Sequence, residues 1–587
     1  MLLVLSMMLT LFAACTEGGN DPTDTVEGTD ETTAEIETFL DIVKDGKLVP
    51  VVYGALAEAS EISVAKSIID RLNSIVGVSG RPVPESVYNP DEVEILVGYT
   101  TYPETQELLD EIGYGESAIK VIGKKLVVVG QDNEALKLAV NHLVNHFNSI
   151  KDKDKNISIS TKYFESLSSN KLVAMMPVHP DFNPTVMDTG RDCYMMHFGG
   201  DTEEFFREYI QLMEDNGFEL YAKNVIEENE YYTYTKDTLV VTALFTKYNR
   251  VSKFLVEELE TTGLAPRAED NAYTPIEGMD TLITQIGLFY NVVIDEKGAM
   301  TNNFNGMSYV IRLDDGSFII VDGGHNDKTH SEHMYETLKM QAPDPENIVI
   351  AAWFFSHEHG DHTGMFKDFI TTYKEKLTIE RFVLNFPTKE MGGSGEASTM
   401  MSYMSGFFKD ADIIKAHPGQ EFHIRNATIT MLYTADVYES GQFTDSNNAS
   451  IVWKMDVNGK SFLCLGDYSE SSKTLRQLYT KETLKSDIVQ IAHHGISGQD
   501  GTIYPIIEPE YAFWPVGAYH VIFYSNGNMP DLELDKKEFN KYFMQVMDQD
   551  KVFLAEDNFI VMSIAADGTI STTTYDNDVD FYANYKN

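Results

Sequence analysis

Basic residues are scarce in this chain, whose 587 residues include 45 Lys and Arg against 91 Asp and Glu, for a formal net charge of -46. Such a surface repels polyanions at long range, and no basic patch lies near the histidines. Nucleic acid is therefore not expected as a partner. Cysteine is also rare, because Cys15, Cys193 and Cys464 are too few for a disulfide framework. After the first 14 residues, no apolar run is long enough to span a bilayer.

The first 14 residues are an apolar run that ends in LFAA before Cys15. This run is short for a membrane span and about right for a signal-peptide core. Small residues before a cysteine resemble a bacterial lipoprotein signal over residues 1–15, which implies a lipid on Cys15. The protein would then be extracytoplasmic and lipid-anchored to the bacterial cell membrane. An ordinary signal peptide or an uncleaved anchor is the alternative, and the lack of basic residues before the core favours a start further upstream.

Residues 16–38 combine acids, Thr and Gly without a basic residue up to position 37, and predict a disordered acidic tether. Residues 39–165 then alternate helical and strand patterns, with helices expected over 55–76 and 133–149. This alternation resembles the small α/β domain that precedes the catalytic barrel of β-hexosaminidases. The resemblance implies a packing or positioning domain rather than a catalytic one.

Residues 170–279 predict an α+β domain. Its amphipathic helix over residues 202–217 starts with acids and ends in glycine. In the strands that follow, Tyr231, Tyr232 and Tyr234 could stack on sugars, although alternating aromatics on a strand usually pack in a core. Glycan contact by the N-terminal domains is therefore one expectation, and plain packing is the other.

A dense cluster of histidines follows the apolar stretch IVIAAWFF at residues 348–355, which predicts a buried strand. The next residues, SHEHGDH, bring His357, His359, Asp361 and His362 into one loop. His357 and His359 lie on the same side of an extended chain. Imidazoles and a carboxylate suit zinc or a similar divalent metal. A single ion does not need four ligands from one loop. The loop therefore predicts two metals.

The order of motifs around this loop resembles the metallo-β-lactamase fold hydrolase superfamily. The loop itself reads HxHxDH. A hairpin pattern over residues 306–324 precedes it, KSFLCLGD delivers Asp467, and IVQIAHHG delivers His493 and His494. The resemblance implies an αββα fold over residues 280–587. The expected class is thus α/β and α+β multidomain, with this C-terminal fold after two smaller domains.

The resemblance also implies a metallohydrolase with two divalent metal ions, zinc being expected and manganese or iron the alternatives. The implied ligands are His357, His359, Asp361, His362, Asp467, His493 and His494, with only one of the last two ligating. His357 and His359 would hold the first metal, Asp361 and His362 the second, and Asp467 would bridge them. Asp361, His493 and His494 are the expected catalytic residues, since the histidine that does not ligate can contact substrate or protonate the leaving group.

Several further residues allow more than one interpretation. Many members of the superfamily supply a further histidine to the first metal, and only His417 and His423 lie in the corresponding interval. The resemblance implies that Asn447 or Asn448 lies near the mouth of the site, and the alternative is that either is simply a turn residue before a strand. Tyr519 and His520 could belong to a substrate loop, or be structural.

The branch of the superfamily can be narrowed by SNNASIV at residues 446–452 together with the two later motifs. They resemble the C-terminal domain of bacterial competence DNA-uptake proteins and the phosphorylcholine esterase that trims teichoic acids. That likeness implies cleavage of a phosphodiester or related ester, small or in the cell wall, at the cell surface. A lactam, lactone or thioester hydrolase on the same fold is the first alternative, because one fold hosts many chemistries. A non-catalytic glycan-binding surface lipoprotein is the second.

Overall fold

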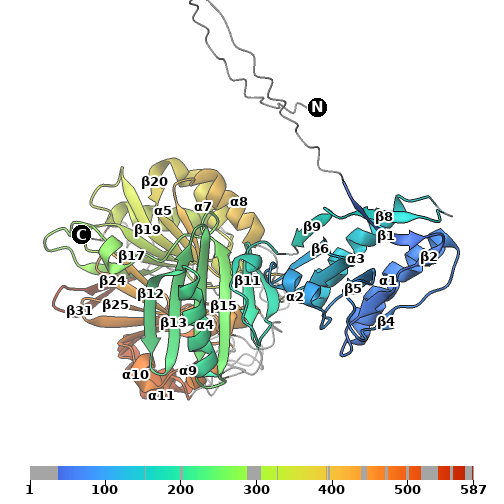
Figure 1. The fold of residues 1–587 in the computed structure, drawn as a ribbon. Helices are drawn as coiled ribbons and strands as arrows, with labels where there is room; N and C mark the ends of the chain where they lie inside the picture. Colours follow the sequence, from blue (N-terminus) through green and yellow to red (C-terminus); the bar gives the residue numbers. More distant parts are fainter. Residues whose placement is uncertain are drawn as a thin grey trace, which may run out of the picture.

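The computed structural model describes residues 37–151, 154–168, 170–198, 202–286, 306–326, 328–389, 391, 393, 397–437, 446–469, 473–496, 502–516, 540–555, 559–575, 583 and 585. The N-terminal apolar run with Cys15, and also Tyr519 and His520, lie outside these residues. Within the described ranges, no helix is both long and apolar enough to cross a bilayer. The chain folds into several sheets with helices packed on them (Figure 1), which confirms the mixed α/β and α+β class expected from the sequence.

The first sheet, drawn in blue in Figure 1, has helices on both faces. Its order is β4 (Val83–Pro84), β3 (Val51–Tyr53), β5 (Glu94–Val97), β7 (Lys125–Gly130), β6 (Glu116–Ile122) and β9 (Phe164–Ser168). Helices α1 (Ala59–Val76) and α3 (Asn133–Asn148) cover one face, and α2 (Pro103–Leu109) covers the other. A small sheet beside it has the order β2 (Lys47–Leu48), β1 (Phe39–Lys44) and β8 (Ile157–Ser160). Helix α1 starts later than the expected position 55, because Glu58 and Glu61 form a capping box there.

The second sheet is antiparallel and lies beside the C-terminal half of the chain (Figure 1). Its order is β10 (Thr185–Gly190), β11 (Cys193–His197), β15 (Val251–Glu258), β14 (Leu239–Thr246), β13 (Asn229–Lys236) and β12 (Glu219–Ile226). Helix α4 (Glu203–Asp215) starts at Thr202, whose side chain accepts a hydrogen bond from the backbone N–H of Phe205. Its apolar side covers one face of this sheet with Phe206, Tyr209 and Met213.

The other face of the second sheet packs on the C-terminal half. Tyr231 and Tyr479 join their hydroxyls at 2.8 Å, and the side-chain amide of Asn229 donates to the Leu478 carbonyl oxygen at 2.9 Å. Tyr231, Tyr232 and Tyr234 are at most 8% exposed. These tyrosines therefore pack in cores and form no exposed strip for stacking sugars.

The C-terminal half is built from two sheets that face each other across one core, with helices outside both. Buried side chains of both sheets, such as Ile311 and Met431, form the core between them. Helices α5 (Lys328–Gln341), α7 (Phe366–Tyr373) and α8 (Ala397–Phe407) cover the outer face of the first of these sheets. Short helices α9 (Thr474–Leu478), α10 (Lys481–Leu484) and α11 (Tyr504–Ile507) cover the outer face of the second.

The strand order of the two sheets brings distant residues to common edges. The first has the order β22 (Asp412–Lys415), β21 (Arg381–Leu384), β19 (Ile348–Phe354), β18 (Phe318–Val321), β17 (Tyr309–Arg312), β16 (Thr281–Gln285), β30 (Phe559–Ile564) and β31 (Ile570–Tyr575), with β20 (Leu377–Ile379) also paired to β19. The second has the order β23 (Glu421–Ile424), β24 (Ala427–Tyr433), β25 (Val452–Val457), β26 (Lys460–Cys464), β27 (Ile488–Gln490), β28 (Tyr511–Trp514) and β29 (Val552–Leu554). Each sheet contains several parallel pairs of neighbouring strands, among them β18 with β19 in the first and β26 with β27 in the second.

Candidate metal centre

The carboxyl ends of these parallel strands position the candidate metal centre. Asp322 follows β18, the histidine-rich loop follows β19, Asp467 comes shortly after β26, and His494 shortly after β27. Parallel neighbours end at the same edge of a sheet, so each sheet presents two of these segments side by side. The loop then turns into the short helix α6 (Gly360–Thr363), which carries Asp361 and His362.

Asp467 lies at the middle of the cluster. Its Oδ1 is 3.1 Å from His362 Nε2, and its Oδ2 is 3.3 Å from His494 Nε2. His494 Nε2 is also 3.3 Å from Asp361 Oδ2 and 3.3 Å from His362 Nε2. Asp361, His362, Asp467 and His494 thus offer ligand atoms that all lie within 4.8 Å of one another. Two imidazole nitrogens and two carboxylates that converge in this way are a donor set suited to a divalent cation.

The two remaining histidines of the loop lie on the same side of the cluster. The ring centroids of His357 and His359 are 4.7 Å apart. His357 is fully buried, and its Nε2 has no hydrogen-bond partner among the described residues, although Asp467 Oδ2 lies 3.9 Å away. A buried nitrogen without a partner is costly, and a cation held with Asp467 would satisfy it. His359 is partly exposed, and its Nε2 is 2.6 Å from the hydroxyl of Ser446.

Outer contacts fix the orientation of two of the imidazoles. Asp322 is fully buried, and its Oδ2 accepts from His362 Nδ1 at 2.7 Å and from the Ser356 hydroxyl at 2.6 Å. This contact turns His362 Nε2 toward Asp467. His494 Nδ1 lies 2.8 Å from the carbonyl oxygen of Pro515, which can only accept, so Nδ1 carries a proton and Nε2 faces the carboxylates.

Charge within the cluster is compensated by its own members. Burial opposes ionisation of Asp467, but the fields of His362 and His494 outweigh it and hold the pKa of Asp467 well below its usual range. Burial also opposes the charge of His494, yet Asp467 and Asp361 raise its pKa to about 9. Burial, together with His362, lowers the pKa of His357 well below its usual value. Protons on the imidazoles thus supply positive charge that balances the carboxylates, and a bound divalent cation would supply that charge in their place.

The geometry distinguishes His493 from His494. His494 is buried within the cluster, whereas the His493 side chain is 18% exposed, with Nε2 at 3.8 Å from Asp467 Oδ2 and 3.3 Å from Asn447 Nδ2. Both residues have a left-handed backbone, with φ of 48° and 52°. Such a conformation costs about 1 kcal/mol or more in a residue other than glycine and is often kept at functional sites.

His417 and His423 lie outside this cluster. His417 is fully buried between Glu257 Oε2 at 2.7 Å and Asp436 Oδ2 at 2.8 Å, so both ring nitrogens are engaged with carboxylates. His423, on β23, has its Nε2 3.9 Å from Glu421. The structure therefore brings neither of the two open candidates to the loop after β19.

Sequence reasoning missed several residues that border the centre. Asp322 appeared only as the end of a hairpin, and Ser446 as the start of a motif. His325 was not considered, yet with His359 and Asp361 it lines a cavity of about 450 Å³ at this edge. The signal that could have revealed Asp322 and His325 is the run Asp-Gly-Gly-His directly after a buried strand. The histidine-rich loop SHEHGDH follows its own buried strand in the same way.

Comparisons with known proteins give distant likenesses only. No protein-family model and no curated protein sequence matches the chain. Among solved structures, the metallo-β-lactamase fold protein YhfI from Bacillus subtilis is similar at 12% identity and TM-score 0.30, over 50% of this chain and 100% of that one. CmlA, a diiron β-hydroxylase from Streptomyces venezuelae, is similar at 15% identity and TM-score 0.26, over 41% of this chain and 45% of its own.

A putative metal-dependent hydrolase from Parabacteroides distasonis is similar at 14% identity and TM-score 0.24, over 42% of this chain and 88% of that one. These values are too low to assign a fold or an activity. The residues of this chain themselves define the site, because they form a cluster able to hold metal ions.

Proposed function

We propose that this protein is a dinuclear metal-dependent hydrolase of the metallo-β-lactamase type that cleaves a phosphodiester or related ester at the cell surface. The observation that carries the proposal is the convergence of Asp361, His362, Asp467 and His494, with ligand atoms within 4.8 Å of one another. The buried and unpartnered Nε2 of His357 beside it supports a further ligand on the same side.

The roles follow from the positions of the side chains. His357, His359 and Asp467 would hold one cation, and Asp361, His362 and His494 would hold the other with Asp467 between them. When bound, a pair of divalent cations lowers the pKa of a water molecule and polarises the oxygen of a substrate. Zinc suits imidazole and carboxylate ligands, as manganese and iron also do.

His493 is the proposed proton donor to the leaving group. It is partly exposed while its neighbour is buried, and the amide of Asn447 lies 3.3 Å from its Nε2. A histidine at the mouth of a site can hold a proton near neutral pH and pass it to a departing oxygen. Asp322 and Pro515 keep the neighbouring rings of His362 and His494 aimed inward.

The charge of the chain limits the substrate. A net charge of -46 opposes the approach of a long polyanion, so a small or cell-wall ester is favoured over nucleic acid. The cavity of about 450 Å³ beside His325 and His359 is within the range of small-ligand pockets, about 300–1,000 Å³.

The location at the membrane is part of the same proposal. The apolar run before Cys15 and the acidic tether over residues 16–38 support a lipid anchor that holds the enzyme outside the cytoplasm. Labelling of cells with a radioactive fatty acid tests this directly. Label on the full chain that is lost in Cys15→Ala supports the anchor, and an unlabelled chain contradicts it.

Turnover tests the chemistry. The full chain loaded with zinc or manganese is assayed with bis-p-nitrophenyl phosphate and with nitrocefin, alongside His359→Ala and, as a matched control, His423→Ala. Phosphodiester turnover that is lost in His359→Ala and kept in His423→Ala supports the proposal. Turnover of nitrocefin alone would assign the site to lactam hydrolysis. A metal-loaded chain inert to a broad ester panel would overturn the enzymatic assignment.

A further inference from the structure

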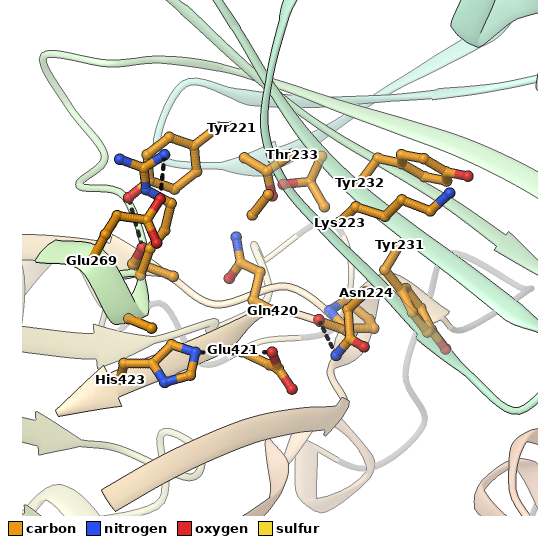
Figure 2. Close-up of a pocket in the computed structure, with 17 residues that line it drawn as sticks. Tyr221, Lys223, Asn224, Tyr231, Tyr232, Thr233, Glu269, Gln420, Glu421 and His423 are labelled. Atoms are coloured by element: carbon orange, nitrogen blue, oxygen red, sulfur yellow. Dashed lines mark hydrogen bonds and ion pairs between the residues drawn. The ribbon is translucent and has the colours of Figure 1, made fainter. Parts of the chain in front are cut away.

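A second cavity lies between the second sheet and the C-terminal half, away from the metal centre. It has a volume of about 230 Å³, and Figure 2 shows its walls. Strands β12, β13 and β14 form one side, and the turn at residues 418–420 with the start of β23 forms the other. None of its lining residues is a member of the cluster around Asp467.

The sheet side of this cavity presents hydroxyl groups. Thr233 on β13 is paired directly with Thr242 on β14, and both face the C-terminal half as their neighbour Tyr231 does. Thr242 is 1% exposed, and its Oγ1 has no hydrogen-bond partner among the described residues. A buried hydroxyl without a partner is uncommon in folded proteins and points to a group that the protein itself does not supply.

Amide groups line the cavity from both sides, Gln420 from the turn and Asn224 from β12. Gln420 extends from its turn into the space between the two walls (Figure 2). Its Oε1 accepts from the backbone N–H of His417 at 2.9 Å, which fixes the side chain and leaves the amide NH₂ as a donor toward the cavity. Asn224 donates from Nδ2 to the carbonyl oxygen of Gly419 at 3.1 Å and borders the same space.

The charged residues of the lining already have protein partners. Arg267 pairs with Glu269 at 3.0 Å and with Asp270 at 2.9 Å, and its guanidinium lies 4.4 Å from the centre of the Tyr221 ring. Lys223 Nζ lies 4.8 Å from the centre of the Tyr232 ring. Because both cations already contact protein groups, the cavity offers mainly hydroxyl and amide groups for recognition and suits a neutral ligand.

We propose that this cavity binds a neutral polyhydroxylated ring, such as one sugar unit. A sugar hydroxyl both donates and accepts, so it can pair with the Thr242 hydroxyl and with the Gln420 amide at once. The volume lies below the range of about 300–1,000 Å³ usual for drug-sized ligands, which fits a single ring. The site would be a glycan-contact point between the second sheet and the C-terminal half, and it holds or fails independently of the proposed hydrolysis.

Ligand-observed NMR and calorimetry on the full chain test this site, with glucose and N-acetylglucosamine as neutral probes and glucose 6-phosphate and acetate as anionic ones. Thr242→Val keeps the shape of the side chain and removes its hydroxyl, so it should weaken sugar binding about fivefold, the factor that one neutral hydrogen bond contributes. Thr242→Phe fills the cavity and should abolish binding. Thr235→Val, on the neighbouring strand β13 and outside the lining, is the matched control and should bind as the parent does.

Each outcome decides the proposal. Binding of a neutral sugar that Thr242→Val weakens, Thr242→Phe abolishes and Thr235→Val leaves unchanged supports it. Absence of binding by both neutral sugars at millimolar concentration overturns it, as does sugar binding unchanged in Thr242→Phe. Binding of the anionic probes alone would overturn the neutral ligand class. Thermal unfolding of each variant shows whether a lost signal reflects the cavity or a misfolded chain.

Discussion

Two buried clusters of histidine and carboxylate lie in the described part of the chain, and they differ in what balances their charge. In the metal-centre cluster (Asp361, His362, Asp467 and His494), neither Asp467 nor the adjoining Asp322 contacts a lysine or arginine among the described residues. In the second cluster, here termed the His417 network, basic side chains already accompany the carboxylates. Its members are Glu257, His417, Asp436, Lys253 and Lys415.

The comparison shows why histidines and carboxylates alone do not define a metal site. Glu257, His417 and the neighbouring Cys193 also bring ligand atoms within 4.8 Å of one another. However, both His417 nitrogens are engaged with carboxylates, and Lys415 donates to the Thr189 carbonyl oxygen at 2.7 Å beside them. A divalent cation added there would leave an excess of positive charge, whereas Asp467 contacts no lysine or arginine in the described part of the chain.

The largest effect is expected from removing the central carboxylate of the metal-centre cluster. Asp467→Ala should lower turnover at least about 10³-fold, because bound metal ions supply several kcal/mol to the reaction. Metal content, measured by elemental analysis of the same sample, should fall with it. Full turnover in Asp467→Ala would show that the cluster around this residue is not the active site.

The next largest effect should appear in the His417 network, and in stability rather than turnover. His417→Ala leaves Glu257 and Asp436 buried without their partner, which costs about 3–5 kcal/mol. Urea unfolding measures this loss. His423→Ala, at a partly exposed site, is the control and should change stability by less than about 1 kcal/mol. If metal content fell in His417→Ala while stability did not, the distinction between the two clusters would be wrong.

The pH dependence of stability sharpens the comparison further. Burial disfavours the charge on His417, but Glu257 and Asp436 outweigh it and raise the pKa of His417 to about 9. A raised histidine pKa stabilises the fold fully below its ordinary value of 6.5, and this contribution is lost as the pH rises through about 9. The loss should reach about 3 kcal/mol. Cys193 stays protonated over this window, because burial raises its pKa.

The midpoint of urea unfolding, compared between about pH 6 and about pH 9.5, measures this loss. The parent chain should lose more stability over this interval than His417→Gln does, and His494, whose pKa is also raised to about 9, should contribute its own loss in both proteins. An equal loss in the two proteins would assign the pH dependence to other groups.

A smaller effect is expected from Asp322→Asn, which changes the orientation of His362 without removing a ligand. Substitution of such an outer partner usually lowers metal affinity or activity about 10–100-fold. Competition with a chelator gives the affinity directly. An affinity equal to that of the parent would mean that the contact at 2.7 Å does not orient the ring.

The helices and strands predicted from the sequence agree best with the structure where local signals determine them. The helix expected over residues 202–217 is α4 (Glu203–Asp215), set by the Thr202 cap, and the expected strand before the histidine loop is β19. The convergence of the loop with Asp467 and His494 was also expected, although through a resemblance rather than through local pattern.

Contacts between segments that are far apart in the chain could not be predicted from the sequence. Asp322 reaches His362 only because β18 pairs with β19, across a separation of 40 residues. The choice between His493 and His494 depends on a left-handed backbone at both residues, a conformation that is uncommon in residues other than glycine. The environment of His417 depends on the docking of the second sheet, which brings Glu257 from 160 residues away.

Elemental analysis of the full chain, purified without chelator, tests the central claim most directly. The account predicts about two equivalents of zinc, manganese or iron per chain, retained in His417→Gln. A chain that is metal-free as purified and takes up none of these ions on incubation would contradict it.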